Sequence, residues 1–161
     1  MQFNLSHSDD RVTYAISADR ALGVDIERVR PLDDMETIAR RFFSGGERQT
    51  LMSLNTGDRL TAFYRCWTRK EAYLKGLGDG LARPLSEFDV SVLPDAQPLL
   101  LRPATTPAER GRWTLSDIDV GPGYVGAIAV DGPRPEIRRW SWRRGTGAGA
   151  SPSTTLSTPR W

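Results

Sequence analysis

Apolar and polar residues alternate at the start of the chain, which is typical of strands that bury one face. The alternating runs cover residues 3–5 and 12–16, and a third apolar run covers 22–26. Turn-forming Ser, Asp and Gly residues separate the three runs, and Pro31 closes the region. The beginning of the chain therefore predicts three short strands.

The spacing of apolar residues then changes to that of amphipathic helices. Asp33 followed by Glu36 resembles a capping box and predicts the start of a first helix. Ser44 followed by Glu47 resembles a second box and predicts a short helix after it.

A longer helix is expected to start at Asp58, which is suited to an N-terminal cap. Three glycines that follow are expected to end it, since glycine is common just past a helix end. Its apolar stripe consists of Leu60, Phe63, Tyr64, Trp67 and Leu74, and the glycines are Gly76, Gly78 and Gly80.

From residue 88 onward the pattern returns to strands, which are predicted at 88–93, 99–101, 113–120, 124–130 and 137–142. Strands, then helices, then strands predict an α+β domain over residues 1–142. The last stretch, residues 143–161, is small and polar without periodicity, and it predicts a disordered tail.

The composition fits one soluble domain. With 161 residues, 39% hydrophobic and 26% charged, the chain is large enough to bury a core. No stretch approaches the roughly 18 apolar residues of a membrane span, and the N-terminus lacks the features of a secretory signal. The single cysteine, Cys66, excludes an internal disulfide and indicates a cytoplasmic location.

Charge argues against nucleic-acid binding, because the net charge is only +2 and the arginines are scattered. A nucleic-acid-binding module that stacks bases on Trp113, Trp140 and Trp142 is the weakest of the functional hypotheses. The basic residues are nevertheless unusual, since Lys70 and Lys75 are the only lysines among 22 Lys and Arg. A lysine kept in such a chain indicates a role for the compact ammonium.

Two carboxylates are expected side by side on the third strand. Asp25 and Glu27 are two residues apart, so their side chains project to the same face. A solvated strand face is the ordinary explanation of such a pair. The alternative is a hard divalent cation, which relieves the repulsion between adjacent acids, and Mg²⁺ favours carboxylates together with phosphate oxygens and water.

The long helix carries a second candidate group. Trp67, Glu71 and Lys75 are spaced four residues apart and form one ridge, and Lys70 lies about 100° around the helix from Glu71. A surface pair between Glu71 and Lys75 is the ordinary explanation. Arginine would serve equally well in such a pair, so the lysines favour phosphate binding.

The only histidine, His7, lies between the hydroxyls of Ser6 and Ser8. A lone histidine is most often structural or on the surface, but this setting also suits a phosphate. No Ser-His-Asp or Cys-His arrangement and no phosphate-binding glycine loop occurs. Together, the three acids, the two lysines and this histidine indicate a Mg²⁺-dependent site for a polyanionic phosphate substrate.

Three blocks in the right order resemble the 4′-phosphopantetheinyl transferases, specifically the larger surfactin-synthetase-activating type. They are FNLSHS at 3–8, GVDIE at 23–27 and WTRKEAYLKGLGDGL at 67–81. The intervening RRFFSGGE also resembles the family, and the similarity covers most of residues 2–130. The third block is the most specific.

The resemblance implies an antiparallel sheet packed on a long helix, and transfer of the phosphopantetheine arm of coenzyme A to a serine of a carrier protein. Adenosine 3′,5′-bisphosphate would be released. Asp25, Glu27 and Glu71 match the acids that hold Mg²⁺ against the pyrophosphate, and Lys75 matches the lysine that contacts the phosphates. Glu71, or a metal-bound water beside it, is expected to be the general base.

The resemblance also implies that Ser6 and His7 meet the 3′-phosphate of the nucleotide and that Lys70 takes part in binding coenzyme A. The carrier is expected to be an acidic helical bundle. Arg40 and Arg41 are a candidate surface for it, although such a pair is more often a solvated face.

The sequence departs from the larger type at its front end, where roughly the first third of such a chain has no counterpart. Residues 1–142 would then hold the C-terminal lobe and the last strands of the N-terminal lobe. A start codon inside a longer reading frame is the favoured explanation. A degraded remnant and self-association of a short chain are the others. A non-catalytic fragment that binds metal or carrier protein also stays open, as does the pathway served.

Overall fold

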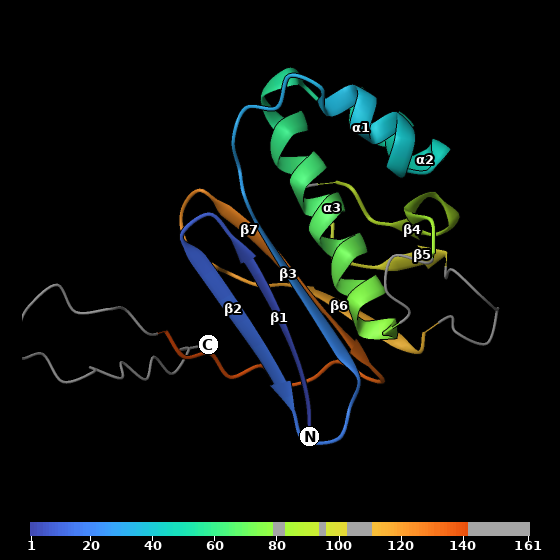
Figure 1. Ribbon diagram of the computed structural model, residues 1–161. Helices are drawn as coiled ribbons and strands as arrows, with labels where there is room; N and C mark the ends of the chain where they lie inside the picture. Colours follow the sequence, from blue (N-terminus) through green and yellow to red (C-terminus); the bar gives the residue numbers. More distant parts are fainter. Residues whose placement is uncertain (79–82, 94–95, 103–110, 142–161) are drawn as a thin grey trace, which may run out of the picture.

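The computed structural model describes residues 1–78, 83–93, 96–102 and 111–141 (Figure 1). The elements in chain order are β1 (Gln2–Ser8), β2 (Arg11–Ser17), β3 (Leu22–Arg28), α1 (Met35–Phe42), α2 (Gly45–Ser53), α3 (Thr56–Leu77), a 3₁₀ turn η2 (Leu85–Glu87), β4 (Asp89–Val90), β5 (Leu100–Arg102), β6 (Trp113–Asp117) and β7 (Tyr124–Asp131). This order confirms the α+β class. No helix within the described residues is long and apolar enough to cross a membrane.

An antiparallel sheet with the order β3-β7-β6 forms the centre of the fold. Helix α3 packs across β3 and β7 on one face of this sheet (Figure 1). Side chains of β3 alternate between the two faces, so Gly23 and Asp25 lie toward α3 while Val24 packs in a smaller apolar cluster with Ala15 of β2. Burial on both faces explains why residues 22–26 are all buried.

Helix α3 and strand β3 come into backbone contact at two glycines. A Cβ atom on Gly23 would lie 2.1 Å from the carbonyl oxygen of Ala72 and 2.3 Å from the amide nitrogen of Gly76. A Cβ on Gly76 would lie 2.6 Å from the ring of Trp113. Gly76 therefore lies inside the helix as a packing residue, and Gly78, with φ of 76°, is the left-handed residue that ends it.

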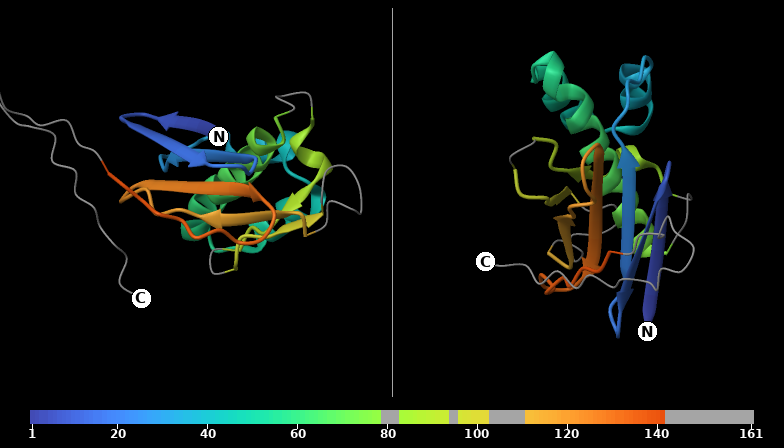
Figure 2. Two further views of the ribbon diagram at one scale, coloured as in Figure 1. Left: turned by 90° about the horizontal axis from the view of Figure 1, so that it is seen from below. Right: turned by 90° about the vertical axis from the view of Figure 1, so that its left-hand side faces the viewer.

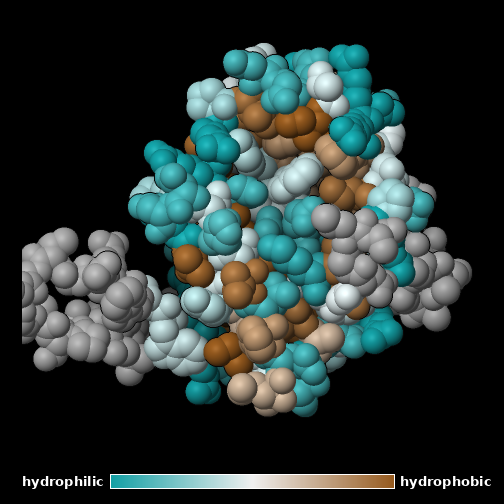
Figure 3. Space-filling model, in the orientation of Figure 1, coloured by the Kyte–Doolittle hydropathy of each residue, from teal (hydrophilic) through white to brown (hydrophobic). Residues whose placement is uncertain are grey.

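The hairpin of β1 and β2 forms a separate antiparallel sheet that packs against β3, away from β6 (Figure 2). Its outer face carries apolar side chains that are 45–69% exposed. Apolar side chains lie over the hairpin in Figure 3 as well. The exposed residues are Phe3, Leu5, Val12, Tyr14 and Ile16.

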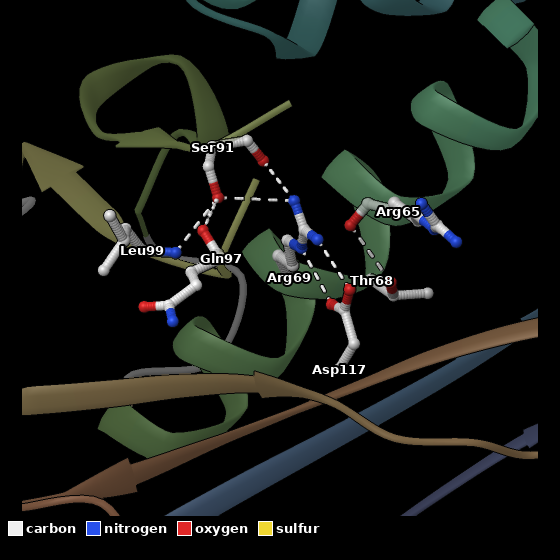
Figure 4. A network of polar contacts seen from close by, with 7 residues as sticks. All are labelled: Arg65, Thr68, Arg69, Ser91, Gln97, Leu99 and Asp117. Carbon is white, nitrogen blue, oxygen red and sulfur yellow. Dashed lines mark hydrogen bonds and ion pairs between the residues drawn. The ribbon is translucent and has the colours of Figure 1, made fainter. Parts of the chain in front are cut away.

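Two fully buried cations on α3 connect the helix to the rest of the domain. Arg69 donates to both carboxylate oxygens of Asp117 on β6, at 2.8 and 2.6 Å, and to the carbonyl oxygen of Ser91 at 2.6 Å (Figure 4). Its side chain is 0% exposed, so these bonds are needed to offset the loss of hydration.

Lys70 is the second buried cation, and its side chain is also 0% exposed. It donates to Glu47 at 2.6 Å and to the carbonyl oxygen of Phe88 at 2.6 Å. The same Glu47 carboxylate accepts from the backbone of Val90 and, at the start of α2, from the backbone of Ser44. The pair therefore joins α2, α3 and β4.

One of the three predicted helix starts is confirmed, and the other two differ in the structure. The capping box of Ser44 and Glu47 is confirmed, with both of its bonds formed. The predicted box of Asp33 and Glu36 is wrong, because α1 begins after Asp34 without a side-chain cap. Helix α3 begins at Thr56 after Asn55, earlier than the expected Asp58, which lies in its first turn.

Two of the later strands are shorter than predicted, since β4 keeps only Asp89–Val90 of the expected 88–93 and β6 ends at Asp117 instead of residue 120. Strands β5 and β7 lie within one residue of their predicted bounds. No strand forms at 137–140, which corrects the prediction for 137–142. Most of these residues are exposed, and an alternating run forms a strand only where a partner strand supplies hydrogen bonds. Residue 142 and the predicted tail at 143–161 lie outside the described residues.

The glycine contact predicts that Gly23→Ala destabilises the protein by several kcal/mol, because a methyl group there requires α3 to move away from β3. Denaturant-induced unfolding measures the change. Gly57→Ala is the matched control, since a Cβ on Gly57 meets nothing within 4 Å near the start of α3. Its expected effect is a gain of up to about 1 kcal/mol. Equal losses in the two variants would contradict the packing role of Gly23.

Candidate functional site

The candidate site lies between β3 and α3, beside the glycine contact. Asp25 and Glu27 follow Gly23 on the face of β3 that lies toward α3. Glu71 and Lys75 are one turn apart on α3. The Lys75 Nζ atom is 2.7 Å from Asp25 Oδ1. The structure thus brings the predicted acids of β3 together with the predicted helix ridge.

Asp25 is the most enclosed acid of the site, with 5% of the residue exposed. Its Oδ1 atom accepts hydrogen bonds from Ser6 at 2.9 Å and from Lys75 at 2.7 Å. Its Oδ2 atom is buried and has no hydrogen-bond partner among the described residues. Burial raises the pKa of Asp25, and the nearby ammonium of Lys75 opposes this only in part.

The other two carboxylates are half-buried and differ in their contacts. Glu27 Oε2 accepts from the hydroxyl of Ser8 at 2.7 Å. Among the described residues, none forms a hydrogen bond with the carboxylate of Glu71. Burial raises the pKa of Glu71, and the negative charge of Asp25 raises it further, while Lys75 lowers it. Glu71 is therefore a carboxylate with raised basicity.

A hard dication fits this set of residues. The Oδ2 atom of Asp25 is a buried oxygen without a hydrogen-bond partner in the described chain, and the carboxylates repel one another without a cation. In the part of the chain that the structure describes, no three Asp, Glu, His or Cys side chains are close enough to hold a metal by themselves. Mg²⁺ commonly takes one or two carboxylates and completes its shell with water and substrate phosphates. The arrangement therefore suits a cation shared with a phosphate ligand.

Three predicted ligand-binding residues are placed differently. Ser6 is 4% exposed and bonds to Asp25 and to the backbone of Ile26, so its hydroxyl does not face a ligand. His7 is exposed and points to the opposite face of β1, because successive side chains of a strand alternate. Lys70 is buried against Glu47, since it lies about 100° around α3 from Glu71. Of the three, only Ser6 contacts a carboxylate of the site, while His7 lies on the other face of β1 and Lys70 is paired elsewhere.

Two residues beside the site were not predicted as part of it. Ser8 bonds Glu27, and Asn4 accepts from the backbone of Val24 at 3.1 Å. The signal in the sequence is three short polar side chains at alternate positions of β1, namely Asn4, Ser6 and Ser8, which share one face. Each lies 20 residues before the β3 residue whose backbone N–H it accepts from.

The family is established by comparison with known proteins. The model of the 4′-phosphopantetheinyl transferase superfamily matches residues 21–129, and the chain belongs to this superfamily. The 4′-phosphopantetheinyl transferase HetI of Nostoc sp. is 40% identical over 140 residues, which are 87% of this chain and 56% of that protein. The 4′-phosphopantetheinyl transferase Sfp of Bacillus subtilis is 33% identical over 131 residues, which are 81% of this chain and 55% of that protein.

The larger type that Sfp represents is thus supported, and the chain spans about half the length of these curated relatives. Among solved structures, the holo-[acyl-carrier-protein] synthase of Thermotoga maritima matches with a TM-score of 0.51 at 17% identity. That match covers 77% of this chain and 68% of the other. At this identity it supports the fold alone, which is the α+β fold of the superfamily.

The raised pKa of Glu71 predicts that Glu71→Gln stabilises the metal-free protein at neutral pH. A carboxyl whose pKa is raised by folding is easier to accommodate when protonated, so its unfavourable contribution grows as pH rises from the unfolded to the folded pKa. In chelator, we expect a higher melting temperature for Glu71→Gln than for the wild type at pH 7, and a smaller difference at about pH 4, near the ordinary pKa of Glu.

The matched control is Glu136→Gln, because the Glu136 side chain is 71% exposed and its ion pair with Arg138 is on the surface. We expect its melting temperature to stay close to that of the wild type at both pH values. A lower melting temperature for Glu71→Gln at pH 7 would contradict the assignment.

Proposed function

We propose that this chain transfers the 4′-phosphopantetheine arm of coenzyme A to a serine of an apo carrier protein, in a Mg²⁺-dependent reaction that releases adenosine 3′,5′-bisphosphate. The observation that carries the proposal is the meeting of Asp25 and Glu27 with Glu71 and Lys75 across the β3–α3 contact. Membership of the phosphopantetheinyl transferase superfamily supports the same reaction.

In the proposed reaction the serine oxygen forms a bond to the phosphorus that carries the pantetheine arm, and the pyrophosphate P–O bond breaks. Asp25, Glu27 and Glu71 are the acids that would surround Mg²⁺, one or two of them as direct ligands and the rest of its shell from water and substrate phosphates. The cation would supply charge neutralisation at the phosphate oxygens when bound. Lys75 has 31% of its side chain exposed. Its ammonium is therefore accessible to phosphate oxygens and to the departing bisphosphate.

The serine must lose its proton as it attacks. Glu71 is the proposed acceptor, directly or through a water beside it, because no hydrogen bond from the described residues engages its carboxylate. Its raised pKa increases its basicity toward that proton. Asp25 is less suited, since Ser6 and Lys75 already occupy one of its oxygens.

A groove between α1 and α2 is the proposed contact surface for the carrier. Arg48 and Arg40, the latter paired with Glu36, line it, and Met52 adds apolar surface. This combination suits an acidic helix with an apolar stripe. The neighbouring Arg41 is exposed on the last turn of α1 and extends the positive charge.

Self-association of the chain stays a prediction. The exposed apolar face of the β1–β2 hairpin is the surface that a second copy would cover. Two other hypotheses predict different results in the following experiment. One is a fragment that binds metal or carrier without transfer, and the other is a nucleic-acid-binding module.

Mass spectrometry of the carrier tests the proposal. The chain is incubated with coenzyme A, Mg²⁺ and an apo carrier protein, and we expect the carrier to gain one phosphopantetheine arm. Glu71→Gln should abolish the gain, because it removes a metal ligand and the proposed base, and Glu136→Gln should retain it.

Two results would contradict the proposal for the chain as given. If transfer occurs only when residues encoded upstream are added, the chain is a non-catalytic part of a longer enzyme. Salt-sensitive binding to random oligonucleotides without any modification of the carrier would favour the nucleic-acid hypothesis.

The role of Lys75 makes a separate prediction. Lys75→Arg keeps the charge but replaces a compact ammonium by a planar fork, so the contact with the phosphates is lost. We expect transfer to slow by about 10- to 100-fold, somewhat less than the cost of deleting a transition-state donor. Steady-state kinetics with the same carrier measures it, and a normal rate would show that the lysine is not required.

A further inference from the structure

Side chains of β1 accept hydrogen bonds from the backbone N–H groups along the outer edge of β3. Asn4 Oδ1 accepts from the backbone N–H of Val24 at 3.1 Å, and Ser6 Oγ accepts from Ile26 at 3.2 Å. Ser8 Oγ accepts from the backbone N–H of Arg28 at 3.1 Å, which completes a series with a two-residue step. These bonds satisfy backbone donors that β7, on the other edge of β3, does not reach.

Two of the three side chains also contact the acids of the site. Ser6 donates to Asp25 Oδ1 at 2.9 Å, and Ser8 donates to Glu27 Oε2 at 2.7 Å. The corresponding neighbour of Asn4 is Gly23, which has no side chain. The bond from a β1 side chain to a β3 amide thus occurs three times, and in two of these cases the same side chain also contacts a carboxylate.

From this geometry we infer that Ser6 and Ser8 are positioning residues, each of which fixes one carboxylate oxygen of Asp25 or Glu27 and leaves the other oxygen for a divalent cation. The inference rests on the proposed function, in which these acids hold the metal. It assigns Ser6 a role other than the phosphate contact predicted from the sequence.

Each serine hydroxyl accepts one hydrogen bond and donates another, so the direction of its hydrogen is defined. Its oxygen accepts from a β3 amide, so the hydroxyl hydrogen is directed at the carboxylate. One oxygen of Asp25 is thereby occupied by Ser6 and Lys75, while Oδ2 stays buried and unpartnered within the described residues. Hydrogen bonds of this kind orient metal ligands, and their loss typically weakens metal binding by about 10- to 100-fold.

Binding of Mn²⁺, followed by electron paramagnetic resonance in the presence of coenzyme A, tests the inference without requiring transfer. The full chain is compared with Ser6→Ala, Ser8→Ala and Asn4→Ala. We expect each serine variant to bind Mn²⁺ about 10- to 100-fold more weakly. Asn4→Ala loses an equivalent bond to β3 but no carboxylate contact, so it should bind Mn²⁺ like the wild type.

Two further measurements keep folding defects separate from positioning. Thermal unfolding of all variants shows whether the serine variants and Asn4→Ala lose similar stability. Ser8→Thr retains the hydroxyl at a half-buried position. It should therefore bind Mn²⁺ more tightly than Ser8→Ala and close to the wild-type value.

Mn²⁺ binding that is unchanged in both serine variants would overturn the positioning role while leaving the proposed transfer intact. Equal weakening in Asn4→Ala would also overturn it, because the effect would then come from the edge of β3 in general. If the wild type transfers no arm, and the serine variants alone bind Mn²⁺ more weakly, the proposed function fails and the positioning role is supported. Absence of Mn²⁺ binding by the wild type would overturn the inference.

Discussion

The contact between Gly23 and Gly76 sets the distance between the two elements that carry the site. Without side chains at these positions, the backbone of α3 lies directly against β3. Asp25 lies two residues after Gly23 on β3, and Lys75 directly precedes Gly76 on α3. The close approach therefore lets the Lys75 ammonium reach the Asp25 carboxylate at 2.7 Å. Any larger residue would separate the two halves of the site as well as weaken the core.

Buried charges hold the same helix in place from the other side. Arg69 binds β6 through Asp117, and Lys70 binds α2 through Glu47, so α3 is fixed in rotation as well as in distance. This fixed rotation turns Glu71 and Lys75 toward β3 while Lys70, their neighbour, lies within the domain. Burial raises the pKa values of Asp25 and Glu71 in this site, and the Lys75 ammonium opposes the rise only in part.

Much of the fold and part of the site followed from local patterns. Strand alternation predicted that Asp25 and Glu27 share a face, and helical spacing predicted the ridge of Glu71 and Lys75. The same rules did not predict that residues 137–140 form no strand, because a strand depends on a partner elsewhere in the chain. They also placed the cap of α1 at Asp33, whereas the helix begins after Asp34 without a side-chain cap.

The sequence alone thus determined the family, the order of most elements and which acids and lysines are candidates for the chemistry, because these depend on residue type and on periodicity along the chain. Only the tertiary structure decided what each group contacts. It placed Ser6 against Asp25, placed Lys70 in a buried pair, and revealed Ser8 beside Glu27. The reason is physical: a hydrogen bond between residues about 20 or 50 positions apart depends on how elements pack, and no local period encodes that packing.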